Sequence, residues 1–589
     1  MKNLWLKKVV CLVFALLYIS MFAEAKNNWI EVKSRNFTVV GNAGEKSIRN
    51  VAVRLEQFRE TLHLLFPKAN LDREVPTVVY VFGSDDSFRE FKPRVKGKIQ
   101  DNVAGYIMER SDQMYIAISK DTRGSLTPYE TIFHEYYHYV LDNNLDDVPP
   151  WFNEGMAEFY STFDIEKDGK TFKIGAPISR HFDSFQRKSL MPIEKLLKTS
   201  YGENFSENNK SNIFYAQSWA FVHYLTLGNE GKRQKQLFKF LEKLNTGISL
   251  EENFKQSFET DFKGMDKELQ KYTQRLTFPV TNYTINTAIE FENSLASRQI
   301  SDGEVELQLG KLAYNLGERE AGEARLRKAL KLEPDLEGAN LWVGYVSMIG
   351  KNYTEAEKLL NRAIELDPKD YLAHTYKAYL SGAQRNPEQA LTEYRRAIEL
   401  QPKMARVQAN LASYQSATGN DDAAFVTYQN ALRLDSRNPN YYYSSSIVSL
   451  RIRRGILASV HAQNWLRIKG WDKSPSVYAV LIAHFGYRIS KQTVNADKIL
   501  QIASEKLDKS VWGYSVVRYL QKQITADELL KLAAADNDKL TEAHCYIGLD
   551  LIFNDQKDQA VPHLQWVKDN GNKDFIEYGF AVAELKRAS

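Results

Sequence analysis

Cysteine is nearly absent from this chain, whose 589 residues include 2, Cys11 and Cys545. If the N-terminal segment described next is removed, one remains and no intrachain disulfide can form. The chain also lacks an excess of one charge, because its 78 Lys and Arg residues nearly balance its 74 Asp and Glu residues and leave a formal net charge of +4. That balance argues against nucleic acid as a partner. A content of 43% hydrophobic residues is typical of a folded globular protein.

Long hydrophobic runs are missing except near the N-terminus. There, three lysines precede an apolar run over residues 9–22, and the small-residue pattern Ala-Glu-Ala follows at 23–25. This order predicts a cleavable signal peptide over 1–25. An uncleaved membrane anchor, the alternative, needs about 20 apolar residues. We therefore expect a secreted protein with no stable membrane anchor after signal cleavage.

An internal repeat with a period of about 34 residues, the period of tetratricopeptide repeats, extends over the segment 305–440. Small residues recur at this spacing, and proline does so at three positions: Gly310, Gly344, Ala378 and Ala412; Gly322, Ala356, Ala390 and Ala424; Ala329, Ala363, Ala397 and Ala431; Pro334, Pro368 and Pro402. Small side chains let two helices approach closely, and proline stands where the second helix must end. The pattern resembles the tetratricopeptide (TPR) repeat. We expect TPR repeats over 300–440 and a helical, degenerate TPR-like region over 441–589.

The residues before the repeats mix strand and helix patterns. β-rich runs at 37–40, 77–81 and 114–118 accompany an amphipathic helical pattern at 43–65, which predicts a small α/β layer. The chain then becomes mainly helical from about 125 to 275, interrupted by a hairpin signal at Asp168-Gly169.

The pattern His-Glu-x-x-His occupies residues 134–138. Residues four apart lie on one face of a helix, so His134 and His138 can bind the same metal ion. Glu135 lies about 100° around the helix, where it can take a proton from water activated by the metal. Thr127 as N-cap and Glu130 in a capping box support a helix here.

Hydrolytic zinc sites usually have a third protein ligand and leave the fourth position to water. Two carboxylates follow His138 in the sequence, first Glu154 and then Glu158, which comes one helical turn later. Spacing alone leaves both open as the third ligand.

Asn153-Glu154-Gly155 and Ala157, coming after the His-Glu-x-x-His pattern, resemble the second metal-binding helix of gluzincins, the clan of thermolysin and the zinc aminopeptidases. The stretch is most similar to the peptidase MA-like family. The resemblance implies an α+β gluzincin-like metallopeptidase domain over 26–280, Glu154 as the third Zn²⁺ ligand, and Glu158 as the residue that orients His134. The gap to Glu154 is shorter than in larger gluzincins, and thermolysin spacing would favour Glu158. The family and the short signal suggest a bacterial protein, periplasmic or extracellular.

Hydrolysis by this chemistry also needs a donor to the oxyanion. Zinc aminopeptidases use a Tyr in this role and thermolysin a His, so the resemblance makes Tyr215 and His223 candidates. Either residue could instead belong to a packing helix.

We therefore expect a secreted, zinc-dependent peptidase that cleaves peptide bonds of a peptide or protein substrate, with Glu135 as general base. The all-α TPR-type solenoid would recruit a protein partner or substrate. Two alternatives stay open: a non-catalytic TPR scaffold with a vestigial or structural zinc site, and a module that binds a surface glycan or peptide. The presence of Glu135 disfavours the scaffold alternative, because a structural zinc site needs no carboxylate between its ligands.

Overall fold

The computed structural model describes residues 29–588 apart from 73–74, 102, 111, 122–127, 146–147, 188, 200–209, 245, 290–294 and 472–474. The predicted signal peptide and the predicted N-cap Thr127 lie outside the described residues. None of the helices in the described ranges has the length and apolar character to cross a bilayer. By compactness the chain divides into two units, one ending at Val346 and one beginning at Ser347.

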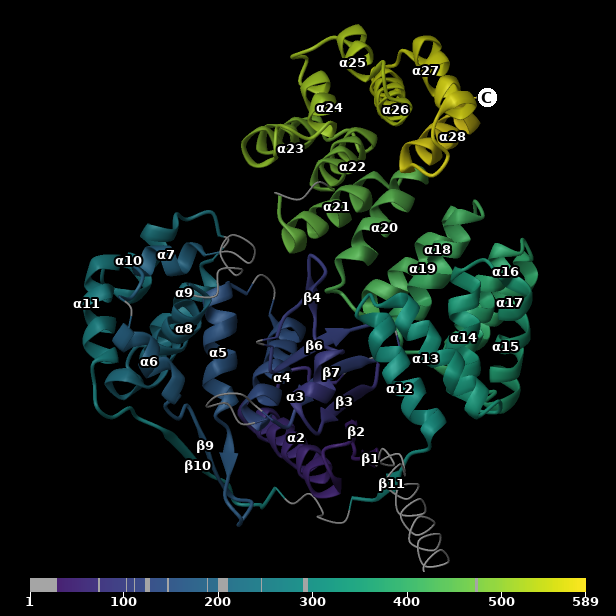
Figure 1. Ribbon diagram of the computed structural model, residues 1–589. Coiled ribbons are helices and arrows are strands. Elements are labelled where there is room, and N and C mark those ends of the chain that lie inside the picture. Colours follow the sequence, from purple (N-terminus) through teal and green to yellow (C-terminus); the bar gives the residue numbers. More distant parts are fainter. Residues whose placement is uncertain are drawn as a thin grey trace, which may run out of the picture. The chain divides into compact units, whose positions relative to one another are not determined.

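A six-stranded sheet forms the centre of the first unit (Figure 1). Its order is β11-β1-β2-β3-β7-β6, with bounds β11 (Ser297–Gln299), β1 (Ile30–Lys33), β2 (Phe37–Gly41), β3 (Thr77–Phe82), β7 (Met114–Ser119) and β6 (Gly105–Glu109). The three strands predicted from the sequence, β2, β3 and β7, are confirmed and run parallel. Every residue of β3 and β7 is buried, as expected for strands covered on both faces.

Alternate side chains of β3 enter two different cores. Val79 and Val81 pack with α2 (Glu45–Leu65) and α4 (Pro128–Asn144) on one face. Tyr80 and Phe82 pack on the other face against α12 (Asp302–Asn315), the first helix of the repeat region. The first repeat helix is therefore a wall of the sheet domain.

The helical half of the first unit surrounds α5 (Pro150–Ser161). The hairpin predicted at Asp168-Gly169 is confirmed, because β8 (Asp164–Ile165) pairs with β9 (Thr171–Ile174) and Gly169 turns the chain at φ +64°. The other elements are α3 (Asp85–Arg89), β4 (Arg94–Val95), β5 (Lys98–Ile99), α6 (Ser179–Arg187), α7 (Ile193–Lys198), α8 (Lys210–Leu227), η1 (Gly228–Gly231), α9 (Gln234–Glu242), α10 (Leu250–Phe258), α11 (Phe262–Thr273) and β10 (Thr281–Thr284).

The predicted repeats are helix pairs in which α12 contacts α13 (Arg319–Leu332), α16 (Tyr371–Ala383) contacts α17 (Pro387–Leu400), and α18 (Ala405–Ala417) contacts α19 (Asp421–Leu434). Between the first and second of these pairs, α14 (Glu337–Ile349) and α15 (Tyr353–Leu366) follow in the sequence with the same spacing. A Cβ on Gly322 would lie 2.5 Å from the Tyr314 backbone nitrogen. Small residues are thus required where the helices of a pair touch.

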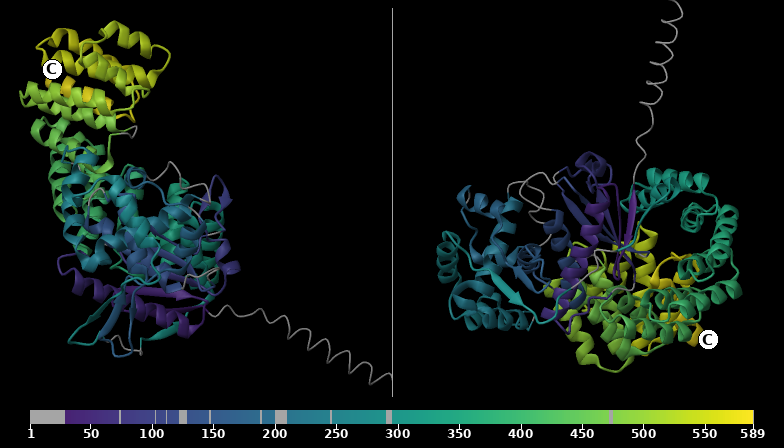
Figure 2. Two further views of the ribbon diagram at one scale, coloured as in Figure 1. Left: turned by 90° about the vertical axis from the view of Figure 1, so that its left-hand side faces the viewer. Right: turned by 90° about the horizontal axis from the view of Figure 1, so that it is seen from below.

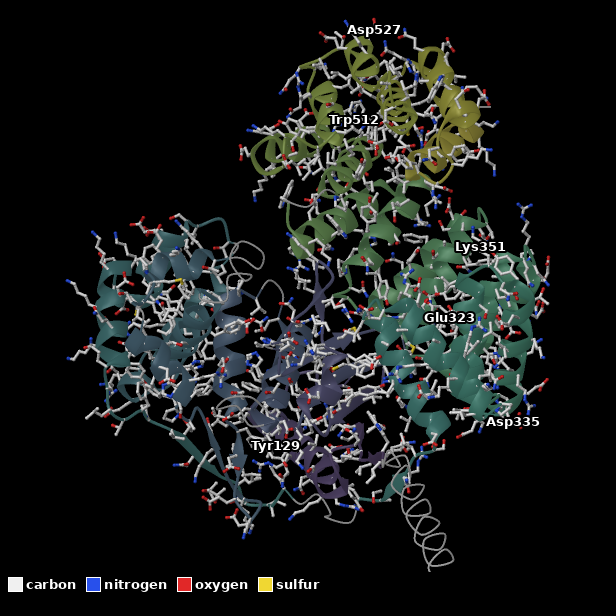
Figure 3. The ribbon with its side chains drawn as sticks, viewed as in Figure 1. Tyr129, Glu323, Asp335, Lys351, Trp512 and Asp527 are labelled. Atoms are coloured by element: carbon white, nitrogen blue, oxygen red, sulfur yellow. The ribbon has the colours of Figure 1, made fainter. Side chains whose placement is uncertain are left out.

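A left-handed turn residue marks each pair and shows that the register continues further than predicted. Positive φ occurs once in every repeat period, at Gly317, Lys351, Arg385, Gly419 and Arg453; Lys351 is marked in Figure 3. A fifth pair, α20 (Pro439–Arg451) with α21 (Gly455–Lys469), therefore keeps the period.

The rest of the second unit consists of further helices (Figure 2, left). These are α22 (Ser476–Ile489), α23 (Thr493–Lys506), α24 (Gly513–Leu520), α25 (Ala526–Ala533), α26 (Asn537–Phe553), α27 (Lys557–Asn570) and α28 (Ile576–Ala588). Gly548 and Ala560 again meet across a pair, because a Cβ on Gly548 would lie 3.5 Å from the Ala560 carbonyl oxygen.

Candidate metal centre

Helices α4 and α5 bring three ligand-type side chains to one point. The Nε2 atoms of His134 and His138 are 3.0 Å apart, and Glu154 Oε2 lies 3.5 Å from the first and 3.4 Å from the second. Two ligands each about 2.1 Å from a tetrahedral zinc ion lie roughly 3.4 Å apart. The three atoms therefore fit a zinc ion, and in the described part of the chain no other group of His, Cys, Asp and Glu converges in this way.

Tight packing of α5 on α8 sets the position of Glu154. A Cβ on Gly155 would lie 2.5 Å from both the Ser218 carbonyl oxygen and Val222 Cγ2, so glycine is needed where the two helices cross. Trp151 packs against Phe221 of α8, with ring centroids 5.1 Å apart. The residues beside Glu154 thus fix α5, and Glu154 with it.

The second ring nitrogen of each histidine faces an oxygen. His138 Nδ1 lies 2.8 Å from Asn153 Oδ1, and His134 Nδ1 lies 3.9 Å from Glu158 Oε1. With a proton on each Nδ1, both Nε2 lone pairs point to the common centre. The contribution of Asn153 was not predicted, although its place directly before Glu154 was the available signal.

Burial and the close contacts shift the pKa values of these groups. Burial by itself raises the pKa of Glu154, but its contacts with His134 and His138 outweigh that effect and lower the pKa to about 2. Burial likewise lowers the pKa of His138, and Glu154 more than reverses this, raising it to about 9. Without a metal ion, a protonated His138 therefore faces the charged Glu154 carboxylate, and a metal ion bound at the centre would take the place of that proton.

Glu135 and Tyr215 line a cavity of about 370 Å³ next to this group, together with His134 and Glu158. The pKa of Glu135 is raised by burial, against the opposing effect of the two histidines. Burial also raises the pKa of Tyr215, so its hydroxyl keeps its proton. The structure therefore places Glu135, Glu158 and Tyr215 beside His134.

The edge strand β6 forms one wall of the same cavity. Ala104 and Gly105 line it, and the Ile107 backbone N–H donates a hydrogen bond to the Glu135 carboxylate. Residues 114–118, the predicted strand that precedes the His-Glu-x-x-His helix in the sequence, do not form this edge. That segment is β7, which lies inside the sheet between β3 and β6.

His223 lies in the core instead of the cavity. Its ring is fully buried, with Nδ1 2.8 Å from the Tyr272 hydroxyl and Nε2 2.9 Å from the Gly175 carbonyl oxygen. Burial lowers its pKa to about 4. Both nitrogens are engaged in packing contacts, so Tyr215 is the better placed of the two donor candidates.

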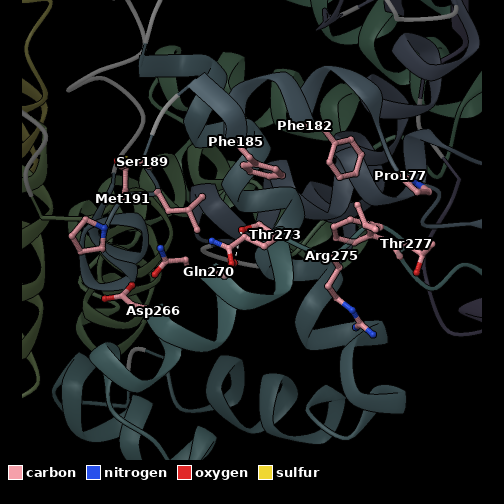
Figure 4. A pocket seen from close by; sticks show the side chains of 15 residues that line it. Pro177, Phe182, Phe185, Ser189, Met191, Asp266, Gln270, Thr273, Arg275 and Thr277 are labelled. Atoms are coloured by element: carbon pink, nitrogen blue, oxygen red, sulfur yellow. Dashed lines mark hydrogen bonds between the residues drawn. The ribbon is translucent and has the colours of Figure 1, made fainter.

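Helix α6 separates this cavity from a larger one. Arg180, His181 and Ser184 face the metal side, whereas Phe182 and Phe185 line a neighbouring cavity of about 1190 Å³ (Figure 4). Glu158 accepts a hydrogen bond from Arg180 and lies 3.3 Å from His181 Nε2. Neither residue was predicted, because no spacing rule connects residue 158 with residues 180 and 181.

Two family models match parts of the chain. The tetratricopeptide repeat model matches residues 307–371 and 377–439, and a model described as a protein of unknown function (DUF1570) matches residues 128–251. The chain thus contains TPR repeats and a domain of unknown function, and that domain carries the candidate metal group. Neither description names a metallopeptidase, so the gluzincin resemblance stays a prediction. No curated protein matches the chain.

Similar solved structures include TPR proteins of bacteria. The chain is 17% identical to PilF of Pseudomonas aeruginosa, with a TM-score of 0.30 over 35% of this chain and 91% of that one. It is 14% identical to PilW, described as a widely conserved type IV pilus biogenesis factor, with a TM-score of 0.30 over 34% and 91%. A tetratricopeptide repeat protein from Parabacteroides merdae is 12% identical, with a TM-score of 0.30 over 48% and 99%.

Proposed function

We propose that the first unit is a zinc-dependent peptidase of the gluzincin type. The observation that carries the proposal is the convergence of His134, His138 and Glu154 within 3.0 to 3.5 Å of one another, beside a cavity that also contains Glu135. A bound zinc ion would supply Lewis-acid chemistry, lowering the pKa of water toward 7 and polarising a carbonyl group.

Glu135 is the general base in this proposal. Its carboxylate lies at the wall of the cavity, and burial raises its pKa, which makes it a better proton acceptor than an exposed carboxylate. After accepting a proton from the attacking water, Glu135 can pass it to the leaving amine. A purely structural zinc site would have no use for such a base.

Tyr215 and β6 hold the substrate in the same proposal. The Tyr215 hydroxyl, protonated at neutral pH, can donate to the oxygen that becomes negative during attack. As an edge strand, β6 leaves backbone groups available to an extended peptide, and Gly105 at its start lines the cavity together with Glu135. These features favour a peptide over a compact small molecule.

The TPR array recruits a protein partner or the substrate itself in this account. Stacked helix pairs form extended surfaces for protein binding, and the array belongs to the same chain as the candidate metal site. Tethering a substrate to the array would raise its effective concentration at the peptidase.

The experiment is cleavage of a proteome-derived peptide library by the zinc-loaded wild type and by Glu135→Gln, with zinc content measured for both. We expect cleavage by the wild type alone and equal zinc in both proteins. If both proteins retain zinc and neither cleaves any peptide, the peptidase proposal fails and the scaffold alternative takes its place.

We also propose export of the chain to the periplasm or the outside of a bacterial cell, on the basis of the N-terminal lysines and apolar run. Sequencing the N-terminus of the mature protein should find Lys26 as its first residue. An intact Met1 on the mature protein would contradict export with signal cleavage.

A further inference from the structure

The two oxygens of the Glu158 carboxylate contact side chains of two different helices, α4 and α6. Its Oε1 faces His134 Nδ1 at 3.9 Å, and its Oε2 lies 3.3 Å from His181 Nε2 and accepts a hydrogen bond from Arg180 Nη2. Glu158 is 4% exposed, so these protein groups are the main partners of its carboxylate. In the described part of the chain, its close charged contacts beyond His134 come from the first turn of α6.

Helix α6 is fixed independently of the metal group. His181 is 2% exposed, and its ring lies 5.5 Å from that of Trp219 on α8. Phe182 packs against Trp219 and Phe278, with ring centroids 6.2 and 5.2 Å away. Arg180 and His181 thus project from a helix that aromatic packing holds in place.

Glu154 and Glu158 lie one helical turn apart on the same face of α5, and the sequence left both open as the third ligand. A carboxylate with a free oxygen could turn toward the metal ion and compete with Glu154. Engaging Oε2 through α6 prevents that turn, because it leaves Oε1 to face the proton on His134 Nδ1.

We propose that Arg180 and His181 are positioning residues of the metal site, which hold Glu158 against His134 and keep it from becoming a ligand. The inference rests on the proposed zinc site and goes beyond it by assigning α6 a role in zinc affinity. Removal of a partner that orients a ligand typically weakens metal binding about 10- to 100-fold.

A double-mutant cycle on zinc affinity tests the inference, with affinity measured by competition against a chelator. Arg180→Met and Glu158→Gln should each weaken zinc binding about 10- to 100-fold. Arg180→Met added to Glu158→Gln should weaken it by less than about 3-fold further, because the two residues act through one contact. His181→Phe keeps the ring on Trp219 and should reproduce the effect of Arg180→Met in part.

Arg54→Met is the matched control. Arg54 is 20% exposed and lies 2.6 Å from Asp164, and Arg180 is 27% exposed and bonded to Glu158, so both substitutions break an ion pair of a half-buried arginine in the first unit. Arg54→Met should leave zinc affinity unchanged. Arg180→Lys, which keeps the cation, should restore most of the affinity lost in Arg180→Met.

Two results would overturn the inference while leaving the proposed peptidase intact: unchanged zinc affinity in folded Arg180→Met and His181→Phe, or effects of Arg180→Met and Glu158→Gln that multiply in the double variant. If the wild type binds no zinc, the proposed function fails together with the inference. Melting of the metal-free proteins separates a loss of folding from a loss of affinity.

Discussion

Two places in the chain, one in each unit, hold buried carboxylates with different partners. In the first unit, Glu154 faces two imidazoles at 3.4 and 3.5 Å. In the second unit, Glu542 accepts a hydrogen bond from the Tyr478 hydroxyl at 3.0 Å, and Glu577 accepts one from the Tyr546 hydroxyl at 2.6 Å. The pKa of Glu154 is lowered to about 2, whereas burial and the neighbouring Glu577 raise that of Glu542 to about 8.

The difference shows that burial by itself does not identify a functional carboxylate. Desolvation raises the pKa in both places, and the partners decide the outcome. At Glu542, burial and the second carboxyl group favour the neutral acid and outweigh the hydrogen bond from the Tyr478 hydroxyl, which by itself lowers the pKa. Imidazole nitrogens that share a centre with the carboxylate favour the charged form and leave room for a cation.

The largest expected effect is on catalysis. Glu135→Gln should lower the rate of peptide hydrolysis about 100- to 10,000-fold, because the general base is lost while the ligands stay. Zinc content should not change. Glu542→Gln removes a buried carboxyl group of the other kind and should leave the rate as in the wild type; equal losses in both variants would erase the distinction between the two places.

The next effect concerns the choice between the two glutamates of α5. Glu154→Ala should lose most bound zinc, because one of three protein ligands is removed. Glu158→Ala should weaken binding by about 10- to 100-fold, because it removes only the partner of His134. Zinc titrations of both variants measure this, and the reverse order would make Glu158 the ligand.

A third effect concerns the stability of the first unit. The sheet face formed by Trp29, Tyr80, Phe82 and their neighbours is covered by α12, and each exposed large side chain costs about 1.5 to 3 kcal/mol. A chain ending at residue 299 should therefore aggregate or melt at much lower temperature than one ending at residue 351. Equal solubility and melting of the two truncated chains would contradict the assignment of α12 to the sheet domain.

The smallest effect is the pH dependence of the second unit. Because the folded-state pKa of Glu542 is raised from about 4.5 to about 8, its contribution to stability is full below about pH 4.5 and is lost as pH rises through about 8. Glu542→Gln should flatten this fall. Hydrogen exchange of α26, corrected for the intrinsic pH dependence of exchange, measures it; an unchanged pH slope in the variant would refute the neutral-acid account.

Local patterns explain what the sequence predicted. The helix expected at 43–65 is α2, and the strands expected at 37–40, 77–81 and 114–118 are β2, β3 and β7. Small residues recurring in one register predicted the TPR pairs, and Ala458, one repeat period after Ala424, carried the unused signal for the fifth pair. His134, His138 and Glu154 could be found because two short motifs on adjacent helices define them.

Long-range contacts explain what the sequence could not predict. The packing of α12 on β3 joins segments that lie far apart in the sequence. The sequence of α12 follows the repeat pattern and gives no separate signal for this contact. Arg180 and His181 stand in a short helix without a motif, and their role depends on where α6 meets α5. The edge position of β6 follows from strand order, which its own five residues do not encode.

Zinc content tests the comparison most directly. Elemental analysis after exhaustive dialysis would be made on the wild type and on two variants that each remove one buried carboxylate with the same change, Glu154→Gln and Glu542→Gln. We predict one zinc ion per chain in the wild type and in Glu542→Gln, and far less in Glu154→Gln. Equal zinc in all three proteins, or no zinc in the wild type, would contradict the assignment of His134, His138 and Glu154 as the metal site.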